Sequence, residues 1–480
     1  MKKKVLVIIL IAILLVSCSG LTACEKSSKG LLLISHDGKT YTVEGMGSCE
    51  DTNVIIPSRY KGKPVTGITS LRSENITSVT IPSSVRSIYW TAFHDCINLT
   101  TVNFEKGSQL IMIDIWTFKD CIKLKSITIP ASVTSIGNNA FNGCISLTNV
   151  YFEEGSQLTS LGDRVFANTA IKSIIIPDTV TKAGVYIFAD CEKLESITAP
   201  AIFSVFGAGA NTYVVTGQTI PKEKFSNLGN VDTIVISSSV TSIGEEAFCN
   251  NDIKSVIFAA DSKLESIGKS AFAFCDNLTS IEIPASVTSI GEDAFNDCDN
   301  LTSVTFANGS KVKSIGDNAF SGCDNLTSVT LEKCGMLETV GNYLFGSCKN
   351  LTSITIPSSV KEIGQGAFAY CSNLEKVIFE KDSQLTNIGY FAFGYCDSII
   401  EITIPSGVTS VAQRLFYSCN LERITIPVTV TSIGEEAFFG CEISQVYYEG
   451  TKEQWKDLIG DNHEGLLRYN PMIYYEYKMN

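Results

Sequence analysis

Apolar and polar positions alternate in short stretches that recur along most of this chain. The cleanest copy covers residues 278–295, LTSIEIPASVTSIGEDAF, and Cys298 follows it. Leu278, Ile281 and Ile283 fall on one face of an extended segment, because side chains alternate along a strand. Pro284 ends that strand, since it has no N–H to donate to a sheet. A motif repeated with a nearly constant period predicts a solenoid.

The second half of the motif should return the chain to the core. Val287 and Ile290 supply the next apolar side chains, and Gly291 is expected to permit a bend. Residues 292–295 are expected to form one short helical turn that ends at Phe295. The acidic residues that begin this segment suit the positive end of a helical turn.

One phenylalanine per copy sets the period of the repeat. It occurs 15 times, mostly 22 to 25 residues apart, at Phe93, Phe118, Phe141, Phe166, Phe188, Phe225, Phe248, Phe272, Phe295, Phe320, Phe345, Phe368, Phe393, Phe416 and Phe438. Some copies are two residues longer, as at 104–110, 152–158 and 379–385, and these should bulge along one edge. With about 4.8 Å per strand, fifteen turns would give a parallel sheet roughly 70 Å long.

One interval breaks this rule. Phe188 and Phe225 are 37 residues apart, and the excess falls in the irregular insert 199–216. A bulged loop and an irregular turn are both compatible with this length, and the solenoid is expected to continue through it. Divergent segments at both ends should cap the core, because a solenoid otherwise exposes its apolar ends. We therefore expect an N-terminal cap at 41–80, the repeat array at 81–446 and a C-terminal cap at 447–480.

The C-terminal cap has its own pattern. Thr451 and Gln454 fit a capping box, which predicts a helix carrying Trp455 on its apolar face. Residues 473–475 are expected to form a last strand. Trp455 fits a plug over the open core better than a sugar-stacking residue.

The first residues have the pattern of a targeting segment. Three lysines precede an apolar run of 12 residues, Val5 to Val16, which is short for a membrane span. Cys18 and Cys24 follow in contexts that resemble bacterial lipoprotein signals, in which the cysteine becomes the lipidated first residue. We expect a signal peptide at 1–23, cleaved before Cys18 or Cys24, with Cys24 in the better-matching context, and a spacer at 24–40. An ordinary secretory signal and an uncleaved anchor are alternatives.

The repeat L-x-x-I-x-I-P-x-x-V-x-x-I-G-x-x-A-F-x-x-C resembles the BspA-like, or Treponema pallidum-type, leucine-rich repeat. Matching residues include Leu351, Ile356, Pro357, Gly364 and Phe368. The resemblance implies a right-handed leucine-rich-repeat solenoid of about 15 repeats on a secreted or surface-anchored protein. Its parallel β-sheet would line the concave face, with short strands and helical turns elsewhere. Adhesion is the role usually suggested for such proteins, and the resemblance assigns no binding residues.

Cysteine is the one chemically reactive residue type that recurs at a fixed position of the repeat. Twelve of the 17 cysteines lie three residues after a landmark phenylalanine: Cys96, Cys121, Cys144, Cys191, Cys275, Cys298, Cys323, Cys348, Cys371, Cys396, Cys419 and Cys441. An extracellular chain with so many cysteines would normally form disulfides. The periodic position instead favours buried small side chains, mostly as free thiols.

Catalytic, cofactor and metal sites are not indicated by the sequence. It contains no Cys-x-x-Cys pair, and its three histidines, His36, His94 and His463, lie in separate regions. Catalytic and phosphate-binding motifs are also missing. The formal charge of −13 argues against binding nucleic acid or anionic membranes through charge, so membrane contact is expected only through the N-terminal lipid.

The outward strand positions carry the remaining information. Most are Ser or Thr, as β-propensity alone would select. Charged and large apolar residues interrupt them, and the C-terminal part is the richest in the residue types of binding hot spots. We therefore expect a possible binding face at Lys376, Ile378, Glu401, Arg423 and Tyr447. The leading hypothesis is a non-enzymatic surface lipoprotein that binds a protein or glycan partner in adhesion. A structural scaffold of the cell envelope is the alternative, and an enzyme is the least favoured class.

Overall fold

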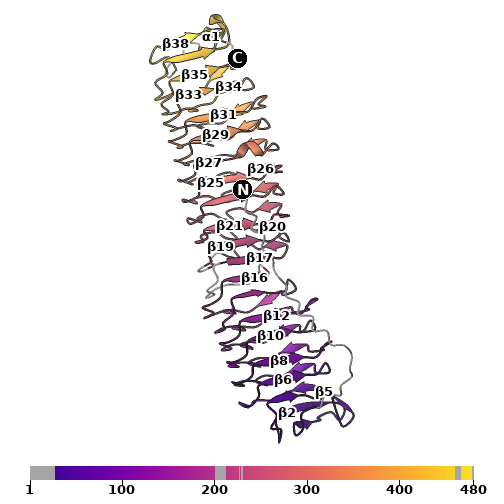
Figure 1. Ribbon diagram of the computed structural model, residues 1–480. Helices are drawn as coiled ribbons and strands as arrows, with labels where there is room; N and C mark the ends of the chain where they lie inside the picture. The colour runs from indigo at the N-terminus through magenta and orange to yellow at the C-terminus, as the bar shows by residue number, and fades with distance from the viewer. Residues whose placement is uncertain (1–26, 201–211, 226–227, 229–230, 460–465, 478–480) are drawn as a thin grey trace, which may run out of the picture.

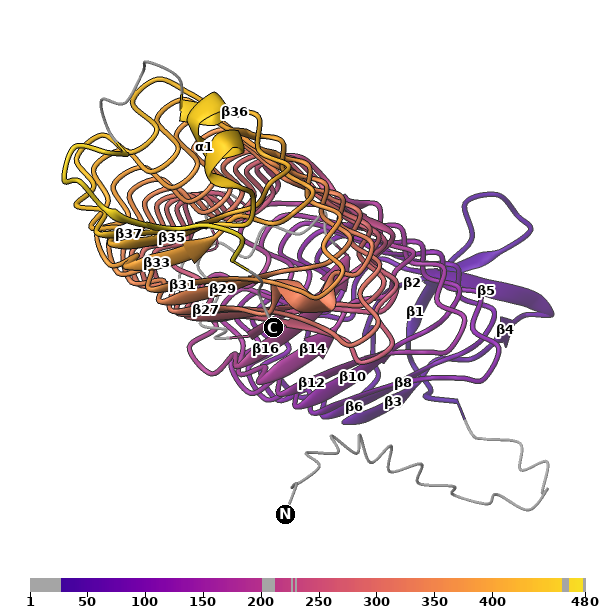
Figure 2. The ribbon, with the colours of Figure 1, turned by 90° about the horizontal axis from the view of Figure 1, so that it is seen from above.

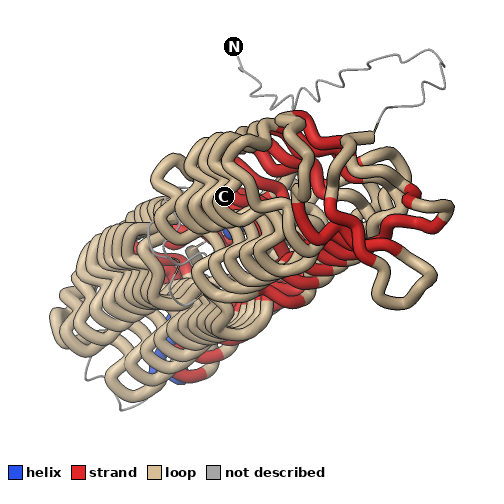
Figure 3. The backbone as a smooth tube through the Cα atoms, turned by 90° about the horizontal axis from the view of Figure 1, so that it is seen from below, coloured by secondary structure: helices blue, strands red, loops and turns tan. Residues whose placement is uncertain are grey.

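The chain folds as one elongated solenoid of about 18 turns. The computed structural model describes residues 27–200, 212–225, 228, 231–459 and 466–477. Figure 1 shows the turns stacked from the N-terminal cap to the helix α1 (Lys452–Ile459) at the other end. Strands and loops make up nearly all of the described chain, as Figure 3 shows. The predicted fold class is confirmed.

Each turn places one strand on the same side of the solenoid, which we call the long-strand face (Figure 2). Neighbouring strands pair in parallel in the register expected from the repeat, for example Ser280 with Ser303 and Ile283 with Phe306. The strands are β3 (Asn53–Ile55), β6 (Ser78–Ile81), β8 (Thr101–Phe104), β10 (Ser126–Ile129), β12 (Asn149–Phe152), β14 (Ser173–Ile175), β16 (Ser196–Pro200), β17 (Thr212–Thr216), β19 (Thr233–Ile236), β21 (Ser255–Phe258), β23 (Ser280–Ile283), β25 (Ser303–Phe306), β27 (Ser328–Val329), β29 (Ser353–Ile356), β31 (Lys376–Phe379), β33 (Glu401–Thr403), β35 (Arg423–Ile426), β37 (Gln445–Tyr448) and β38 (Met472–Tyr474).

A second line of strands runs along another side of each turn. All but the first are two residues long, and they end at the isoleucine or equivalent residue that precedes the motif glycine. They are β5 (Lys63–Ile68), β7 (Ser87–Ile88), β9 (Met112–Ile113), β11 (Ser135–Ile136), β13 (Ser160–Leu161), β15 (Lys182–Ala183), β18 (Thr219–Ile220), β20 (Ser242–Ile243), β22 (Ser266–Ile267), β24 (Ser289–Ile290), β26 (Ser314–Ile315), β28 (Thr339–Val340), β30 (Glu362–Ile363), β32 (Asn387–Ile388), β34 (Ser410–Val411) and β36 (Ser432–Ile433).

The N-terminal cap is built from β1 (Leu32–Ile34), β2 (Tyr41–Gly45) and β4 (Arg59–Tyr60). β1 pairs antiparallel with β2, and β4 pairs antiparallel with β5. β2 then joins β5 in parallel and so connects the cap to the array. Because β1 lies within 24–40, this range is not only a spacer: the folded part begins before residue 41.

The landmark phenylalanines form two long stacks inside the solenoid. Within the described chain each packs on the next with ring centroids 5.0–5.9 Å apart and planes 4–15° from parallel, from Phe93 to Phe188 and again from Phe225 to Phe438. These rings are almost completely buried. Burying a phenylalanine contributes about 1.5–3 kcal/mol, so the stack is a major source of stability.

The prediction of a short helical turn at 292–295 is wrong. The segment is a turn and not a helix: Asn296 N–H donates to the carbonyl of Asp293 at 3.0 Å, but Asp293 has a left-handed backbone with φ 54°. The N–H groups of Asp293 and Phe295 instead donate to the carbonyls of Asp317 and Ala319 in the next turn, at 3.0 and 2.8 Å. The residues two before and two after most landmark phenylalanines share this positive φ. The backbone therefore bonds between turns here, and the acidic pairs do not begin helices.

Gly291 also has a different role from the expected bend. Its φ is not positive, but a Cβ at this position would lie 2.5 Å from the backbone N of Lys269 and 2.6 Å from the carbonyl carbon of Gly268. Glycine is required because consecutive turns approach each other closely at this point.

The cysteine ladder is a ladder of hydrogen bonds. Cys371 Sγ donates to the carbonyl of Phe345 in the preceding turn at 3.1 Å, and the same carbonyl accepts the N–H of Cys348 at 3.2 Å. Ten other ladder cysteines make the equivalent contact at 2.9–3.2 Å. All 15 cysteines in the described chain are free thiols. The thiols therefore donate a second hydrogen bond to a buried carbonyl as well as filling space.

One departure from cysteine supports this interpretation. Asn251 takes the ladder position after Phe248, and its Nδ2 donates to the carbonyls of Phe225 and Phe248 at 2.5 and 2.9 Å. The amide supplies the same donor as the thiol. At this position donor capacity is thus retained although the residue type changes, because an unpaired buried carbonyl is costly.

The longer copies are shaped by two local contacts. The carboxylates of Glu105, Glu153 and Glu380 accept the N–H of a residue in the preceding turn at 2.8–3.0 Å. The serine that follows each of them accepts the N–H two residues later at 3.3 Å, as with Ser383 and Leu385. These recurring polar residues therefore have structural roles.

The irregular insert is a shortened turn. β17 pairs with β16 only 16 residues earlier, Ser196 with Thr212, and then with β19. The long-strand face is thus continuous, while residues 201–211 lie outside the described chain. Tyr213 packs edge-on against Phe225 at 5.5 Å, where the phenylalanine stack is interrupted.

The C-terminal cap agrees with its pattern. Helix α1 (Lys452–Ile459) begins with a capping box in which Thr451 N–H donates to Gln454 Oε1 at 2.8 Å and Gln454 N–H to Thr451 Oγ1 at 3.3 Å. Trp455 is 1% exposed and packs on Tyr448. A plug over the core is therefore confirmed, and burial excludes a sugar-stacking role for this ring.

We expect Cys371→Ala to lower the free energy of unfolding by about 1–3 kcal/mol, because it removes both the thiol donor and buried volume. Cys371→Ser keeps a donor and should cost less. Urea unfolding followed by circular dichroism measures both. Cys249→Ala, at a partly exposed cysteine outside the ladder, is the matched control. Equal losses for the Ala and Ser variants at Cys371 would contradict a hydrogen-bonding role.

Burial should also make the ladder thiols unreactive. It raises the pKa of Cys275, Cys323, Cys371 and Cys441 to about 12, so at pH 8 they stay protonated. We expect iodoacetamide at pH 8 to label Cys249 in the native chain and the ladder cysteines only after unfolding. Mass spectrometry of the labelled peptides gives the result, and rapid native labelling at Cys371 would show that the thiols are accessible.

Candidate functional site

A groove of about 1500 Å³ lies on the long-strand face at the C-terminal end of the array. Its walls come from β31, β33, β35 and β37 and the loops that follow them. All five residues expected at a binding face line it: Lys376, Ile378, Glu401, Arg423 and Tyr447. The structure therefore brings the five predicted residues into one place.

Strand register explains why these residues converge. Glu401 pairs with Arg423 across β33 and β35, and Thr425 pairs with Tyr447 across β35 and β37. Alternate residues of a strand face the same way, so a register without slips keeps every outward side chain on the surface. The first wall is extended by the long-copy loop after β31, which contributes Glu380 and Asp382.

An ion pair occupies the middle of the groove. Arg423 Nε and Nη2 donate to one oxygen, Oε2 of Glu401, at 3.1 and 3.0 Å, and Nη1 lies 3.5 Å from Glu422 Oε2. This arginine is therefore held in a defined orientation between two carboxylates. Lys376 is exposed and belongs to no ion pair in the part of the chain that the structure describes.

Tyrosines form the wall nearest the cap. Tyr447 stacks on Tyr474 with centroids 4.9 Å apart, and Tyr477 lies 4.8 Å from it at 51°. The hydroxyl of Tyr447 donates to Gln445 Oε1 at 3.0 Å. Tyr477 comes from the C-terminal cap and lines the groove, so the cap contributes to it. Ile378, 48% exposed, adds an apolar surface on the opposite side.

The groove carries an excess of negative charge. Its basic residues are Lys376 and Arg423, against seven carboxylates at Glu375, Glu380, Asp382, Asp397, Glu401, Glu422 and Glu442. Aromatic and apolar surface beside unneutralised carboxylates suits a partner with apolar and positively charged groups.

A second group of aromatic residues, three exposed and two half-buried, was missed by the sequence analysis. Tyr370, Tyr395, Phe391, Tyr417 and Phe439 touch one another along the loops that contain the landmark phenylalanines. Tyr370 and Tyr395 stack with centroids 5.0 Å apart. An aromatic residue one or two places after Phe368, Phe393, Phe416 and Phe438 was the available pattern.

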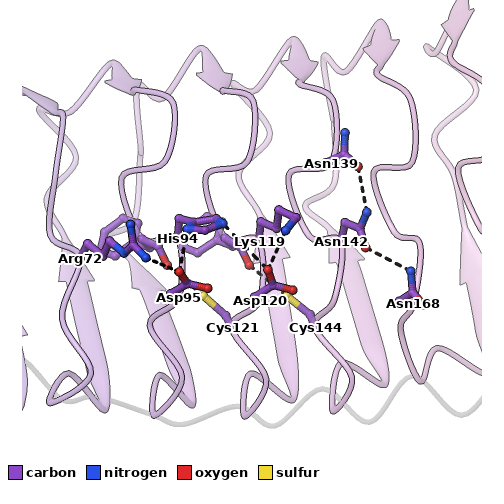
Figure 4. Close-up of polar contacts among 12 residues, drawn as sticks. Arg72, His94, Asp95, Lys119, Asp120, Cys121, Asn139, Asn142, Cys144 and Asn168 are labelled. Atoms are coloured by element: carbon purple, nitrogen blue, oxygen red, sulfur yellow. Dashed lines mark hydrogen bonds and ion pairs between the residues drawn. The ribbon is translucent and has the colours of Figure 1, made fainter.

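His94 also has neighbours that the sequence did not show. Its Nδ1 lies 3.1 Å from Asp95 Oδ2, and its Nε2 lies 3.9 Å from Asp120 Oδ2 in the next turn (Figure 4). These three side chains are close enough to share a metal ion. However, Lys119 Nζ binds Asp120 at 2.7 Å and Arg72 binds Asp95, so both carboxylates are already neutralised. The arrangement fits an ion-pair network better than a metal centre.

The remaining histidines and the candidate lipidation cysteines do not contribute to these sites in the part of the chain that the structure describes. His36 is exposed and contacts Glu44 at 2.9 Å. His463, Cys18 and Cys24 lie outside the described residues. Across the described ranges, no helix is long and apolar enough to cross a membrane.

Comparison with solved structures finds similar chains among bacterial leucine-rich repeat proteins. One from Bacteroides ovatus is 23% identical, with a TM-score of 0.40, and the match covers 94% of this chain and 99% of that one. A leucine-rich cell surface protein from Faecalibacterium prausnitzii is 22% identical over 90% and 97%, with a TM-score of 0.30. The pneumococcal vaccine antigen PcpA is 19% identical over 94% and 98%, with a TM-score of 0.30. A search of curated proteins gives no match.

A family model matches directly. The BspA-type leucine-rich repeat region matches residues 68–208, 218–335 and 313–445, which together cover more than half of the chain. These ranges contain every landmark phenylalanine and most of the groove. The chain therefore belongs to the BspA-type leucine-rich repeat family.

Proposed function

We propose that this chain is a non-enzymatic cell-surface lipoprotein whose solenoid binds a protein partner, as in adhesion. The groove around Arg423 and Tyr447 is the proposed site, and its composition is the observation that supports this most directly. A glycan remains within the same hypothesis as a partner class, but the seven groove carboxylates disfavour acidic glycans. They favour a protein segment that carries Lys or Arg beside apolar side chains.

The frame itself contributes little specificity. Motif residues such as Phe295, Gly291 and Cys298 are explained by stacking, bonding and close packing between turns. Specific recognition therefore falls to the outward positions that the repeat leaves free, and Lys376, Arg423 and Tyr447 are three of these. Aromatic residues and arginine dominate measured binding hot spots.

We expect Arg423→Thr with Tyr447→Thr to weaken partner binding about tenfold or more, since each replaces a hot-spot type by a residue typical of this face. Residues 27–480 would be tested against host matrix proteins, polysaccharides and envelope extracts from the producing cell. Glu282→Thr with Val235→Thr, at outward strand positions away from the groove, is the matched control. Unchanged capture by the groove variant would reject the site. Capture only of the cell's own envelope components would favour the scaffold function.

Lipidation is the second part of the proposal. Residues 1–23 are proposed as the signal peptide, with Cys24 preferred over Cys18 as the acceptor. Growth with an alkyne-labelled fatty acid should label the wild type and Cys18→Ser, and not Cys24→Ser. Label lost only with Cys18→Ser would move the site, and an unlabelled wild type would remove the lipoprotein assignment.

A further inference from the structure

Two of the three tryptophans are exposed on adjacent turns near the N-terminal end. Trp90 is 64% exposed and Trp116 41%. Tyr89, Ile111 and Ile115 are 40%, 50% and 39% exposed beside them. We call these five residues the tryptophan patch. Large apolar side chains exposed together are unusual on a soluble surface and mark an interaction site.

The repeat places these side chains next to one another. Thr91 N–H donates to the carbonyl of Ile115 at 3.2 Å, so the loop of Trp90 lies directly beside the loop of Trp116. Ile111 N–H donates to the carbonyl of Arg86 at 2.9 Å and extends the patch along the same two turns. Lys119 lies on the loop of Trp116, and Arg72 lies on the corresponding loop one turn before that of Trp90 (Figure 4).

The patch is confined to these two turns. In the next turn Asn138 and Asn139 replace Ile115 and Trp116, and Thr134 replaces Ile111. Figure 4 shows polar asparagines continuing along this side of the solenoid. Stacking the turns therefore does not require the exposed tryptophans, because later turns stack without them.

Measured along the solenoid axis, the patch lies within two turns of the point where the proposed lipid anchor joins the fold. Ser28 is fixed to the solenoid, since its N–H donates to Ile55 O at 2.8 Å and its Oγ accepts Ile55 N–H at 3.0 Å. Ser28 follows Cys24 by four positions, which limits the reach to about 14 Å. Trp90 and Trp116 follow β6 and β8, one and two strand spacings beyond β3, or about 5 and 10 Å along the axis.

Charge is distributed unevenly along the chain. Residues 27–125 contain eleven Lys and Arg against nine Asp and Glu, a net charge of +2. Residues 126–480 contain 22 against 40, a net charge of −18. The N-terminal turns can therefore approach an anionic membrane that repels the rest of the solenoid. The total charge alone conceals this difference.

We propose that the tryptophan patch lies in the headgroup region of an anionic phospholipid bilayer, beside the N-terminal lipid. The inference rests on the lipidation proposed above and adds a second, non-covalent membrane contact. Tryptophan and tyrosine favour this interface because their rings are apolar with a polar edge. The contact orients the solenoid, and the groove at β31–β37 then lies roughly 60 Å along the axis from the patch.

The three tryptophans make a direct test. The full lipidated chain is reconstituted in vesicles of equal parts phosphatidylcholine and phosphatidylglycerol with brominated acyl chains, which quench nearby tryptophan. Trp455→Phe leaves only Trp90 and Trp116, and we expect about twofold quenching and protection from aqueous iodide. Trp90→Ser with Trp116→Ser leaves only the buried, distant Trp455, whose emission should not change.

Wild type and the double serine variant form an independent comparison if Trp455→Phe does not fold. The difference between their quenching isolates Trp90 and Trp116. Full iodide access and no bromine quenching at these residues, in protein shown by mass spectrometry to be lipidated, would overturn the proposal and leave the patch to a protein partner. An unlipidated chain would overturn it through the anchor instead, and the fatty-acid label distinguishes the two failures.

Discussion

Each turn of this protein can bury its apolar side chains only against the two turns beside it. All the recurring contacts join one turn to the next, about 5 Å away along the axis. They include the stacked phenylalanines, the hydrogen bonds from thiols to carbonyls, and the close backbone approach at glycines such as Gly291. A solenoid with this constraint is stabilised by nearest-neighbour terms, so its length is set by copy number and by the caps. As a result, the outward side chains of the long-strand face are spaced regularly along the solenoid.

Functional specificity must then come from positions where contacts between turns do not determine the residue type. The groove around Arg423 combines outward strand residues, a long-copy loop and Tyr477 from the C-terminal cap. The tryptophan patch uses the loops before Phe93 and Phe118 in the first turns. The two surfaces lie at opposite ends of the rod and differ in charge, which fits one membrane-facing end and one partner-facing end.

Sequence periodicity was sufficient for the fold, the strands of the long-strand face and the convergence of Lys376, Glu401 and Tyr447, because parallel register follows from a constant repeat. It failed at residues 292–295, where spacing alone does not distinguish a helical turn from a loop whose N–H groups bond to the next turn. Contacts between turns, such as His94 with Asp120, were also hidden, since they depend on stacking geometry. The donor role of the cysteines had one visible trace, the asparagine at position 251.

The shortened turn between β16 and β17 has a mechanical consequence. Inter-turn hydrogen bonds run along the solenoid axis, so tension between an anchored N-terminus and a captured partner would load them in series. Such a series yields at its weakest junction, and the phenylalanine stack is interrupted between Phe188 and Phe225. The rod would then extend first at its middle, which would protect the groove and the anchored end from the load.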